Sequence, residues 1–159
     1  MVLHKDGGIL DQLAVLIGDW DGTLQRRYCH LSNASALLSE CLEDINWVGF
    51  YLVDDSGQKL VLGPFQGKVA CTDIPFSRGV CGLCARTAKS VRVDDVHAFA
   101  DHIACDSASR SELVVPLLDA KGRVVGVLDV DSPKLGRFTS MDQEFLEGAA
   151  AVISRLLYS

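Results

Sequence analysis

The chain has 159 residues, a formal net charge of −6 at pH 7, and 48% hydrophobic and 23% charged residues. This composition is typical of one soluble globular domain, which we take to span residues 1–159, and no apolar run is long enough to cross a bilayer. The net negative charge disfavours nucleic acid and anionic membrane as partners, because the chain has no excess of basic residues to neutralise phosphate groups.

The first residues lack the basic segment and long apolar core of a secretory signal, so we expect a cytoplasmic protein. In that compartment, six cysteines indicate catalysis, redox sensing or metal binding rather than a structural disulfide framework.

Helices are predicted over most of the first forty-odd residues. Apolar residues with the spacing of one buried helical face occur early in this stretch, and a second helix is expected over residues 32–42. Both helices are expected to pack on a sheet. The early apolar residues are Leu10, Leu13, Leu16 and Ile17.

A hairpin follows, with strands over residues 46–53 and 58–63 joined by a turn at residues 54–57. Residues 64–110 contain glycines, prolines and most of the cysteines, so we expect a long irregular insertion with a functional role. Within it, a short helix is predicted near residues 80–87 and a strand at residues 90–93.

The last third of the chain predicts a second hairpin and a final helix. Strands over residues 112–118 and 123–131 are joined by a turn at residues 119–122, and a helix capped by Thr139 runs to residue 157 with a polar face at Glu144 and Glu147. The fold class is therefore α+β, with an antiparallel central sheet and the N- and C-terminal helices packed on one side.

Cys105 lies in a polar stretch of small residues that leads directly into a strand. Reactive cysteines occupy partly exposed polar settings, whereas structural cysteines are buried among apolar side chains. Cys105 is therefore a candidate nucleophile, and the upstream Cys71 and Cys81 are candidate partners for it. Cys29 and Cys41 fall in the helical N-terminal part and are expected to have no redox role.

Cys81 and Cys84 have the Cys-x-x-Cys spacing of some zinc sites and dithiols. A single pair is weak evidence, and we predict no metal. Two histidines flank the Cys105 loop; they either tune the Cys105 thiol or, more commonly, hydrogen-bond the loop backbone. The additional zinc ligands that the chain offers are Cys71, Cys105, His97 and His102.

Three carboxyl groups are expected to converge near the thiols. Asp129 and Asp131 alternate on one strand and so point to the same face, and Glu112 opens the neighbouring strand. The strand that carries Asp129 and Asp131 has apolar residues on both of its faces, which is typical of a strand covered on both sides. These acids are therefore expected to be partly desolvated, and one of them could stay protonated near neutral pH. Such a cluster can bind an ammonium group and donate a proton to a leaving oxygen.

Trp47 and Tyr51 share a strand face with Gly49 between them. They fit either the core or a pocket wall. A glycine at this position leaves room for another group to approach, which favours the pocket wall.

Several segments together resemble the signature blocks of the free methionine-(R)-sulfoxide reductases, a family built on a single GAF domain. The resemblance extends from about residue 31 to the C-terminal helix, and the three cysteine blocks in this order make it specific. The segments are NWVGFY (46–51), GPFQGKVAC (63–71), RGVCG (78–82), DVH (95–97), HIACDSAS (102–109), SE (111–112) and GVLDVDSP (126–133).

The resemblance implies that Cys105 is the catalytic cysteine and that Cys71 and Cys81 are the other redox cysteines. It also implies a substrate pocket in which aromatic side chains surround the methyl end and acids surround the sulfoxide and ammonium groups. Cys84 is not part of the family pattern, so the thiol that resolves Cys105 stays open between Cys71, Cys81 and Cys84. The implied pocket residues are Trp47, Tyr51, Glu112, Asp129 and Asp131.

The implied reaction begins with attack of the Cys105 thiolate on the sulfur of free methionine-(R)-sulfoxide, while Glu112 or Asp131 protonates the oxygen. The resulting sulfenic acid condenses with a nearby thiol, and an external dithiol such as thioredoxin reopens the disulfide. The resemblance implies no bound cofactor and a possible homodimer.

Two other functions remain open from the sequence. One is a non-enzymatic GAF-type sensor that binds a small ligand or registers oxidants through a disulfide of Cys105. The other is a small metal-binding module. The convergence of the three acids with the thiols favours the enzyme over the sensor.

Overall fold

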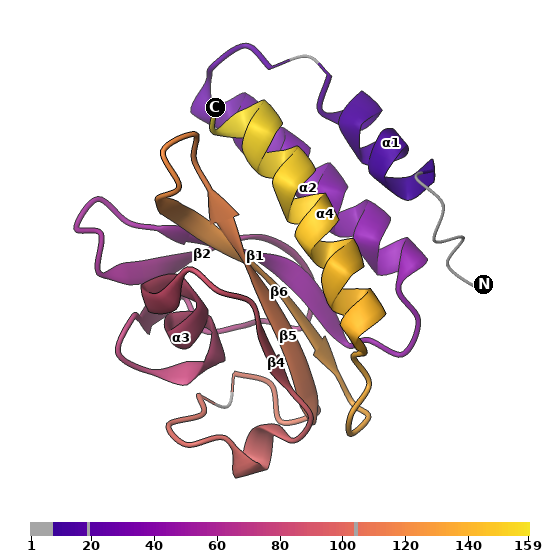
Figure 1. Cartoon of the computed structure of the whole chain (residues 1–159), viewed down its shortest axis with the longest axis vertical. Helices are drawn as coiled ribbons and strands as arrows, with labels where there is room; N and C mark the ends of the chain where they lie inside the picture. The colour runs from indigo at the N-terminus through magenta and orange to yellow at the C-terminus, as the bar shows by residue number, and fades with distance from the viewer. Residues whose placement is uncertain (1–7, 19, 104) are drawn as a thin grey trace.

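The computed structural model describes residues 8–18, 20–103 and 105–159. Helices at both ends of the chain and one in its middle pack around one central sheet (Figure 1). In chain order they are α1 (Gly8–Leu16), α2 (Leu24–Cys41), β1 (Trp47–Val53), β2 (Lys59–Gly67), β3 (Asp73–Pro75), α3 (Gly79–Thr87), β4 (Val91–Val93), the 3-10 helix η1 (Val96–Ala98), β5 (Ser111–Leu118), β6 (Val124–Ser132) and α4 (Ser140–Leu157).

The sheet has the strand order β3-β2-β1-β6-β5-β4, and every neighbouring pair is antiparallel. The two predicted hairpins, β1–β2 and β5–β6, lie beside each other because β1 pairs with β6 at the centre. The predicted α+β class with an antiparallel central sheet is confirmed.

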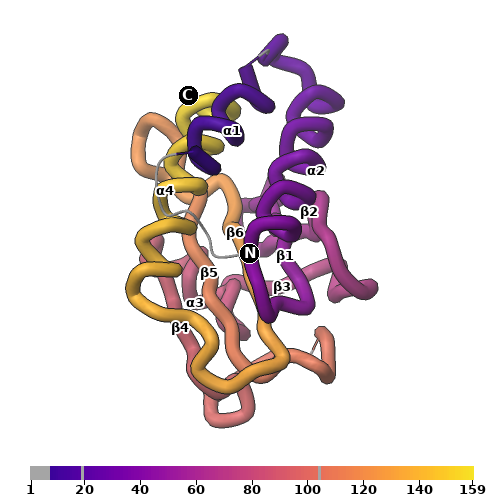
Figure 2. Tube along the Cα trace, turned by 90° about the vertical axis from the view of Figure 1, so that its right-hand side faces the viewer, coloured from indigo at the N-terminus to yellow at the C-terminus, as the bar shows by residue number. Residues whose placement is uncertain are grey.

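The helices divide between the two faces of the sheet. The long helices α2 and α4 run across one face, with α1 packed against both (Figures 1 and 2). Their shared core includes Phe50, Leu113 and Leu128. The opposite face carries α3, in a second core with Trp47 and Tyr51. The predicted packing of the N- and C-terminal helices on one side is therefore confirmed.

The N-terminal helices differ from the prediction in two respects. Helix α2 begins at Leu24 rather than at residue 32, because the Thr23 hydroxyl accepts a hydrogen bond from the Arg26 N–H and caps the helix. Leu16 is 41% exposed, although it was expected on the buried face. The buried line is instead Leu13 and Ile17, which lie four residues apart.

Strand β2 continues to Gly67, four residues beyond the predicted end. The sequence pattern stops at Pro64 because proline has no N–H for the ladder. In the structure, Pro64 falls at a bulge, where the pairing with β1 shifts between Gly49 and Tyr51, so the missing donor interrupts no paired position. The predicted helix and strand at residues 80–87 and 90–93 are present as α3 and β4, whereas β3 was missed.

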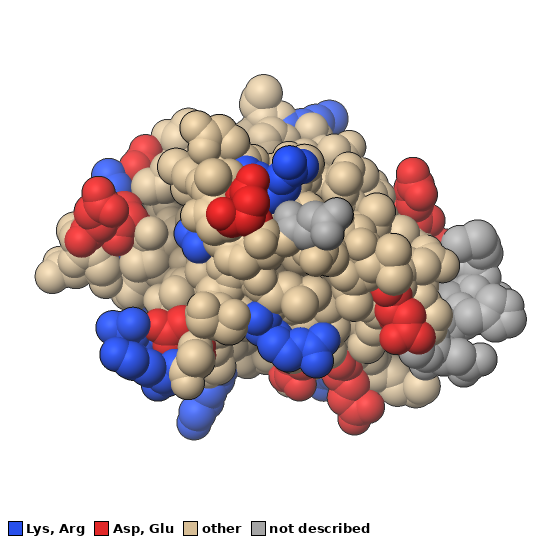
Figure 3. Space-filling model, turned by 90° about the horizontal axis from the view of Figure 1, so that it is seen from above, with Lys and Arg blue, Asp and Glu red and all other residues tan. Residues whose placement is uncertain are grey.

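The C-terminal helix begins as predicted at Thr139, whose side chain and Asp142 form a reciprocal capping box. None of the described helices combines the length and apolar character that a bilayer span requires. Seen from above, acidic and basic side chains are interspersed over the described part of the surface (Figure 3).

Candidate active site

Strands β5 and β6 place three acids on the face of the sheet that α3 covers. Glu112 lies directly opposite Asp131, and Asp129 lies between Val114 of β5 and Gly49 of β1. Glu112 and Asp129 are buried, and Asp131 is half-buried. The alternation of side chains along the strands, from which their convergence was predicted, is therefore present, and burial shields Glu112 and Asp129 from water.

A disulfide joins Cys71 to Cys105, with 5.4 Å between their Cα atoms. Cys71 lies in the loop between β2 and β3, and Cys105 lies in the loop between η1 and β5. Of the three thiols that the sequence left open as partners for Cys105, the structure pairs Cys71. Cys81 and Cys84 are free and buried on α3.

Side chains at the start of β1 hold both disulfide loops. The Trp47 indole N–H donates to the carbonyl of Lys68 at 3.2 Å, and the Tyr51 hydroxyl donates to the carbonyl of Cys71 at 3.0 Å. On the other side, the Asn46 amide donates to Asp106 at 3.0 Å and to Ser109 at 3.1 Å. One strand therefore fixes the positions of the two segments that the disulfide joins.

A small cavity lies between the acids and the Cys105 loop, with a volume of about 40 Å³. Cavities that hold small-molecule ligands are several times larger, roughly 300–1,000 Å³. In this disulfide form the site is therefore closed to all but a few water molecules. The residues that line the cavity include Trp47, Tyr51, His102, Ile103, Cys105, Glu112, Asp129 and Asp131.

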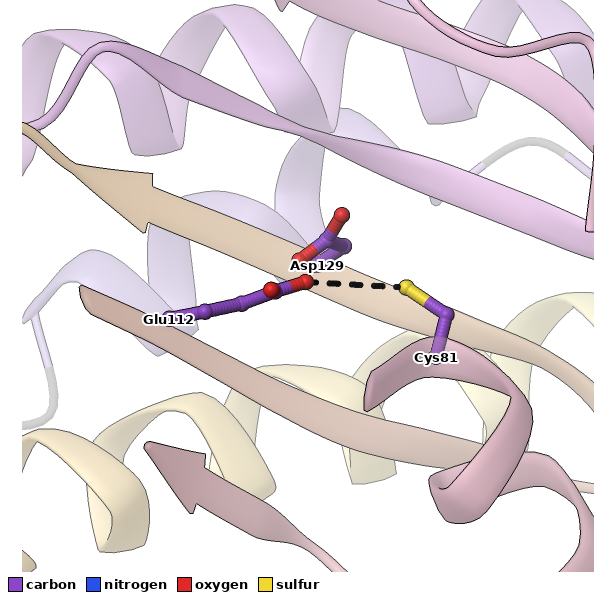
Figure 4. A group of neighbouring side chains, drawn as sticks. All are labelled: Cys81, Glu112 and Asp129. Carbon is purple, nitrogen blue, oxygen red and sulfur yellow. Dashed lines mark hydrogen bonds between the residues drawn. The ribbon is translucent and has the colours of Figure 1, made fainter. Parts of the chain in front are cut away.

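The Cys81 thiol points at the acids (Figure 4). It donates to Glu112 Oε1 with a sulfur–oxygen distance of 3.9 Å, and one ligand atom from each of Cys81, Glu112 and Asp129 lies within 4.8 Å of the others. This group could hold a metal ion. Among the described residues, the zinc ligands considered from the sequence do not come together: the disulfide consumes Cys71 and Cys105, and the group around Cys81 includes neither Cys84 nor a histidine.

Burial raises the pKa of all three carboxyl groups. The pKa of Glu112 is well above its usual range, first because of burial and then because Asp129 and Asp131 add negative charge. Burial and the Asp129 charge also raise the pKa of Asp131 well above its usual range. The pKa of Asp129 rises only to about 6, because hydrogen bonds from Glu112 and Cys81 stabilise its carboxylate against burial. Burial and mutual repulsion therefore favour the protonated form more strongly at Glu112 and Asp131 than at Asp129.

Burial also shifts the pKa values of Cys81 and His102 in the direction of their neutral forms. Burial, followed by the charges of the acids, raises the pKa of the Cys81 thiol well above its usual range. Burial and, to a smaller extent, His97 lower the pKa of His102. His102 lines the cavity as a neutral imidazole, whereas His97 is exposed outside it.

Gly49 has a different role from the one expected. A Cβ atom there would overlap Phe65 and come within 2.9 Å of the Trp47 ring. Trp47 stacks on Phe65 with 5.2 Å between ring centroids, and on Tyr51 with 5.8 Å. The space above Gly49 is therefore filled by aromatic side chains of the wall and is not open to a ligand.

Sequence reasoning missed several residues of the site. Phe65 extends the aromatic stack, Asn46 and Ser109 anchor the Cys105 loop, and Ile103 lines the cavity. The only available signal was their position inside the motif blocks. Cys29 and Cys41 lie on α2, outside the cavity lining, and Cys84 is fully buried with a pKa raised to about 12 by burial.

Known proteins share both the sequence and the fold. The GAF domain pattern matches residues 34–157. Over 127 residues the chain is 53% identical to the free methionine-R-sulfoxide reductase of Escherichia coli (strain K12), which corresponds to 80% of this chain and 75% of that protein. The chain belongs to the free methionine-R-sulfoxide reductase family of GAF domains.

Other members of the free methionine-R-sulfoxide reductase family are similarly close. The Saccharomyces cerevisiae enzyme is 46% identical over 132 residues, covering 80% of this chain and 73% of that protein. The crystal structure of the Neisseria meningitidis enzyme in complex with its substrate superimposes with a TM-score of 0.85 at 44% identity, covering 94% of this chain and 86% of that one.

Proposed function

We propose that the protein reduces free methionine-(R)-sulfoxide to methionine and restores its active thiol through the Cys71–Cys105 disulfide. Membership of the family makes the chain an oxidoreductase. The observation that carries the proposal is the placement of this disulfide at a cavity lined by three acids and two aromatic rings.

In the reduced protein, the Cys105 thiolate attacks the sulfoxide sulfur while a protonated acid donates its proton to the oxygen. Methionine leaves and Cys105 is left as a sulfenic acid. The Cys71 thiol then attacks the Cys105 sulfur, the new S–S bond forms, and the oxygen leaves as water. Formation of this disulfide protects the catalytic sulfur from irreversible oxidation.

The different pKa values of the acids support separate roles for them. The raised pKa values of Glu112 and Asp131 favour their protonated forms, which are suited to donate a proton to the sulfoxide oxygen. Asp129 carries the carboxylate, which is suited to pair with the substrate ammonium group. Trp47 and Tyr51 supply the aromatic wall for the methyl end.

Closure of the cavity in the disulfide form supports an ordered cycle. A volume of about 40 Å³ leaves no room for an amino acid, so substrate enters only after reduction frees the Cys105 loop. An enclosed site that binds both the ammonium and the carboxylate group excludes a methionine sulfoxide within a polypeptide.

The electrons come from an external dithiol, for which we propose thioredoxin or a similar small dithiol protein of the cytoplasm. No bound cofactor takes part in the proposed cycle. We also propose a homodimer. Exposed apolar side chains near the start of the chain support it, at Val15, Leu16, Leu24 and Tyr28.

The test is methionine release from the free R and S sulfoxides and from a peptide-bound sulfoxide, with dithiothreitol as reductant. We expect release from the free R form alone. Release from the peptide would contradict the enclosed site, and no release from any substrate would favour a ligand or redox sensor.

A further inference from the structure

We propose that the reductant attacks Cys71 rather than Cys105, and that it docks on residues 68–71, the loop that precedes β3; this inference rests on the proposed function. The partner that fits is a dithiol protein with an apolar surface beside its attacking thiolate. Three features support the assignment: the absence of Cys71 from the lining of the acid cavity, the exposed side chains of Lys68 and Val69, and the free backbone groups of the loop.

The two sulfur atoms of the disulfide have different surroundings. Cys105 lines the acid cavity together with Glu112 and Asp129, whereas Cys71 is not part of the cavity lining. A thiolate that approaches Cys105 through the cavity meets the Asp129 carboxylate and Asp106. Near Cys71, by contrast, Asp73 is paired with Lys59 at 2.9 Å, and Lys68 is exposed. An anionic nucleophile is therefore repelled less at Cys71.

Val69 is the most exposed of the large apolar side chains in the described part of the chain, at 88%. It lies two residues before Cys71 on a loop that Trp47 and Tyr51 hold in place. The fold therefore fixes the backbone while leaving this side chain in water. An apolar group presented in this way beside a reactive disulfide suits contact with a partner protein.

The same loop offers backbone donors. Residues 69–71 lie outside the helices and strands, and their N–H groups donate no hydrogen bond among the described residues. A partner segment can accept from them, as extended segments do when they pair with a second chain. The partner would then be aligned across the Cys71 sulfur.

The exchange conserves atoms and electrons. The first thiolate of the reductant attacks Cys71 Sγ, a mixed disulfide forms with Cys71, and the Cys71–Cys105 bond breaks. Cys105 leaves as a thiolate into the cavity. The second thiol of the reductant then attacks its own mixed disulfide, which releases Cys71 and leaves the reductant oxidised by two electrons.

The test maps the mixed disulfide. The oxidised protein is treated with thioredoxin in which serine replaces the second cysteine, quenched with acid, alkylated and digested with trypsin. Trypsin separates the two sites, into peptide 69–78 with Cys71 and peptide 93–110 with Cys105. We expect thioredoxin on peptide 69–78 in large excess. Equal or greater linkage to peptide 93–110 would overturn the inference.

A substitution tests the docking surface. Val69→Ser should lower kcat/KM for thioredoxin about fivefold, which is the loss expected for part of a buried apolar side chain. Turnover with dithiothreitol should stay within about twofold, because the side chain is exposed in the free protein. The matched control is Leu135→Ser in the loop between β6 and α4, which is 52% exposed and should alter turnover with neither reductant.

Failure of the docking surface and failure of the proposed function would give different results. If dithiothreitol supports turnover but Val69→Ser leaves thioredoxin kinetics unchanged, the docking surface is wrong and the proposed function stands. If dithiothreitol supports no turnover with the wild-type protein, the proposed function fails, while the mapping experiment still reports which sulfur of the disulfide is attacked.

Discussion

Reduction of the Cys71–Cys105 disulfide should destabilise the protein measurably. The bond closes a loop across a sequence separation of 34 residues. Loop-closure entropy for that length stabilises the folded state by about 4 kcal/mol relative to the open chain. In a protein of this size, that difference corresponds to a fall of about 8–15 °C in Tm on reduction.

The measurement is urea unfolding followed by tryptophan fluorescence, with and without dithiothreitol, together with thermal scans of the same samples. Cys71→Ser should unfold like the reduced wild-type protein under both conditions, since it cannot form the bond. Cys29→Ser, which alters an exposed cysteine outside the site, should behave like the wild-type protein. If oxidised and reduced wild-type proteins unfold at the same urea concentration, the attribution of stability to this bond is refuted.

Three further outcomes follow from the site. Cys105→Ser should abolish methionine release from the free R sulfoxide while Cys29→Ser retains it; normal turnover in Cys105→Ser would exclude the proposed nucleophile. Because the pKa of Asp129 rises on folding from 3.8 to about 6, the folded protein binds a proton that the unfolded chain releases. Asp129 should therefore contribute a fall of about 3 kcal/mol in stability as pH rises from about 4 to above 6, and Glu112 and Asp131, whose pKa values are also raised, should add to it. Asp129→Asn should make the fall in urea unfolding between pH 4 and 8 smaller, and an unchanged pH dependence would contradict a contribution from Asp129. Gly49→Ala should destabilise the protein by about 1–3 kcal/mol in the same assay, because the added Cβ would overlap Phe65; wild-type stability would show that the aromatic wall can shift.

Local signals in the sequence were sufficient for much of the fold. Turn residues at 54–57 and 119–122 predicted both hairpins, and the threonine before α4 predicted its first turn. The convergence of Glu112 with Asp131 could be predicted because side chains alternate between the two faces of a strand and one short turn joins the two strands. These features depend on contacts between residues close in sequence, or on one hairpin register.

The remaining features depend on long-range geometry. Cys71 and Cys105 lie in two loops and are 34 residues apart in the sequence. Whether they meet depends on where the fold places both loops, and nothing in the local sequence specifies that. The stacking of Phe65 on Trp47 depends on the bulge in β2, which adds one residue and changes which side chains share a face. Burial of Cys81 against Glu112 depends on where α3 settles on the sheet.

The disulfide also affects the sheet, because of where its two cysteines lie relative to the strands. Cys71 lies two residues before β3, an edge strand of the sheet, and Cys105 lies six residues before β5. The bond therefore links the edge strand β3 to the segment that enters β5, across the three strands that lie between β3 and β5. Each catalytic cycle forms and breaks this link. Amide hydrogen exchange in β3 and in residues 105–110 should quicken together on reduction, which would report the redox state of the protein with no substrate present.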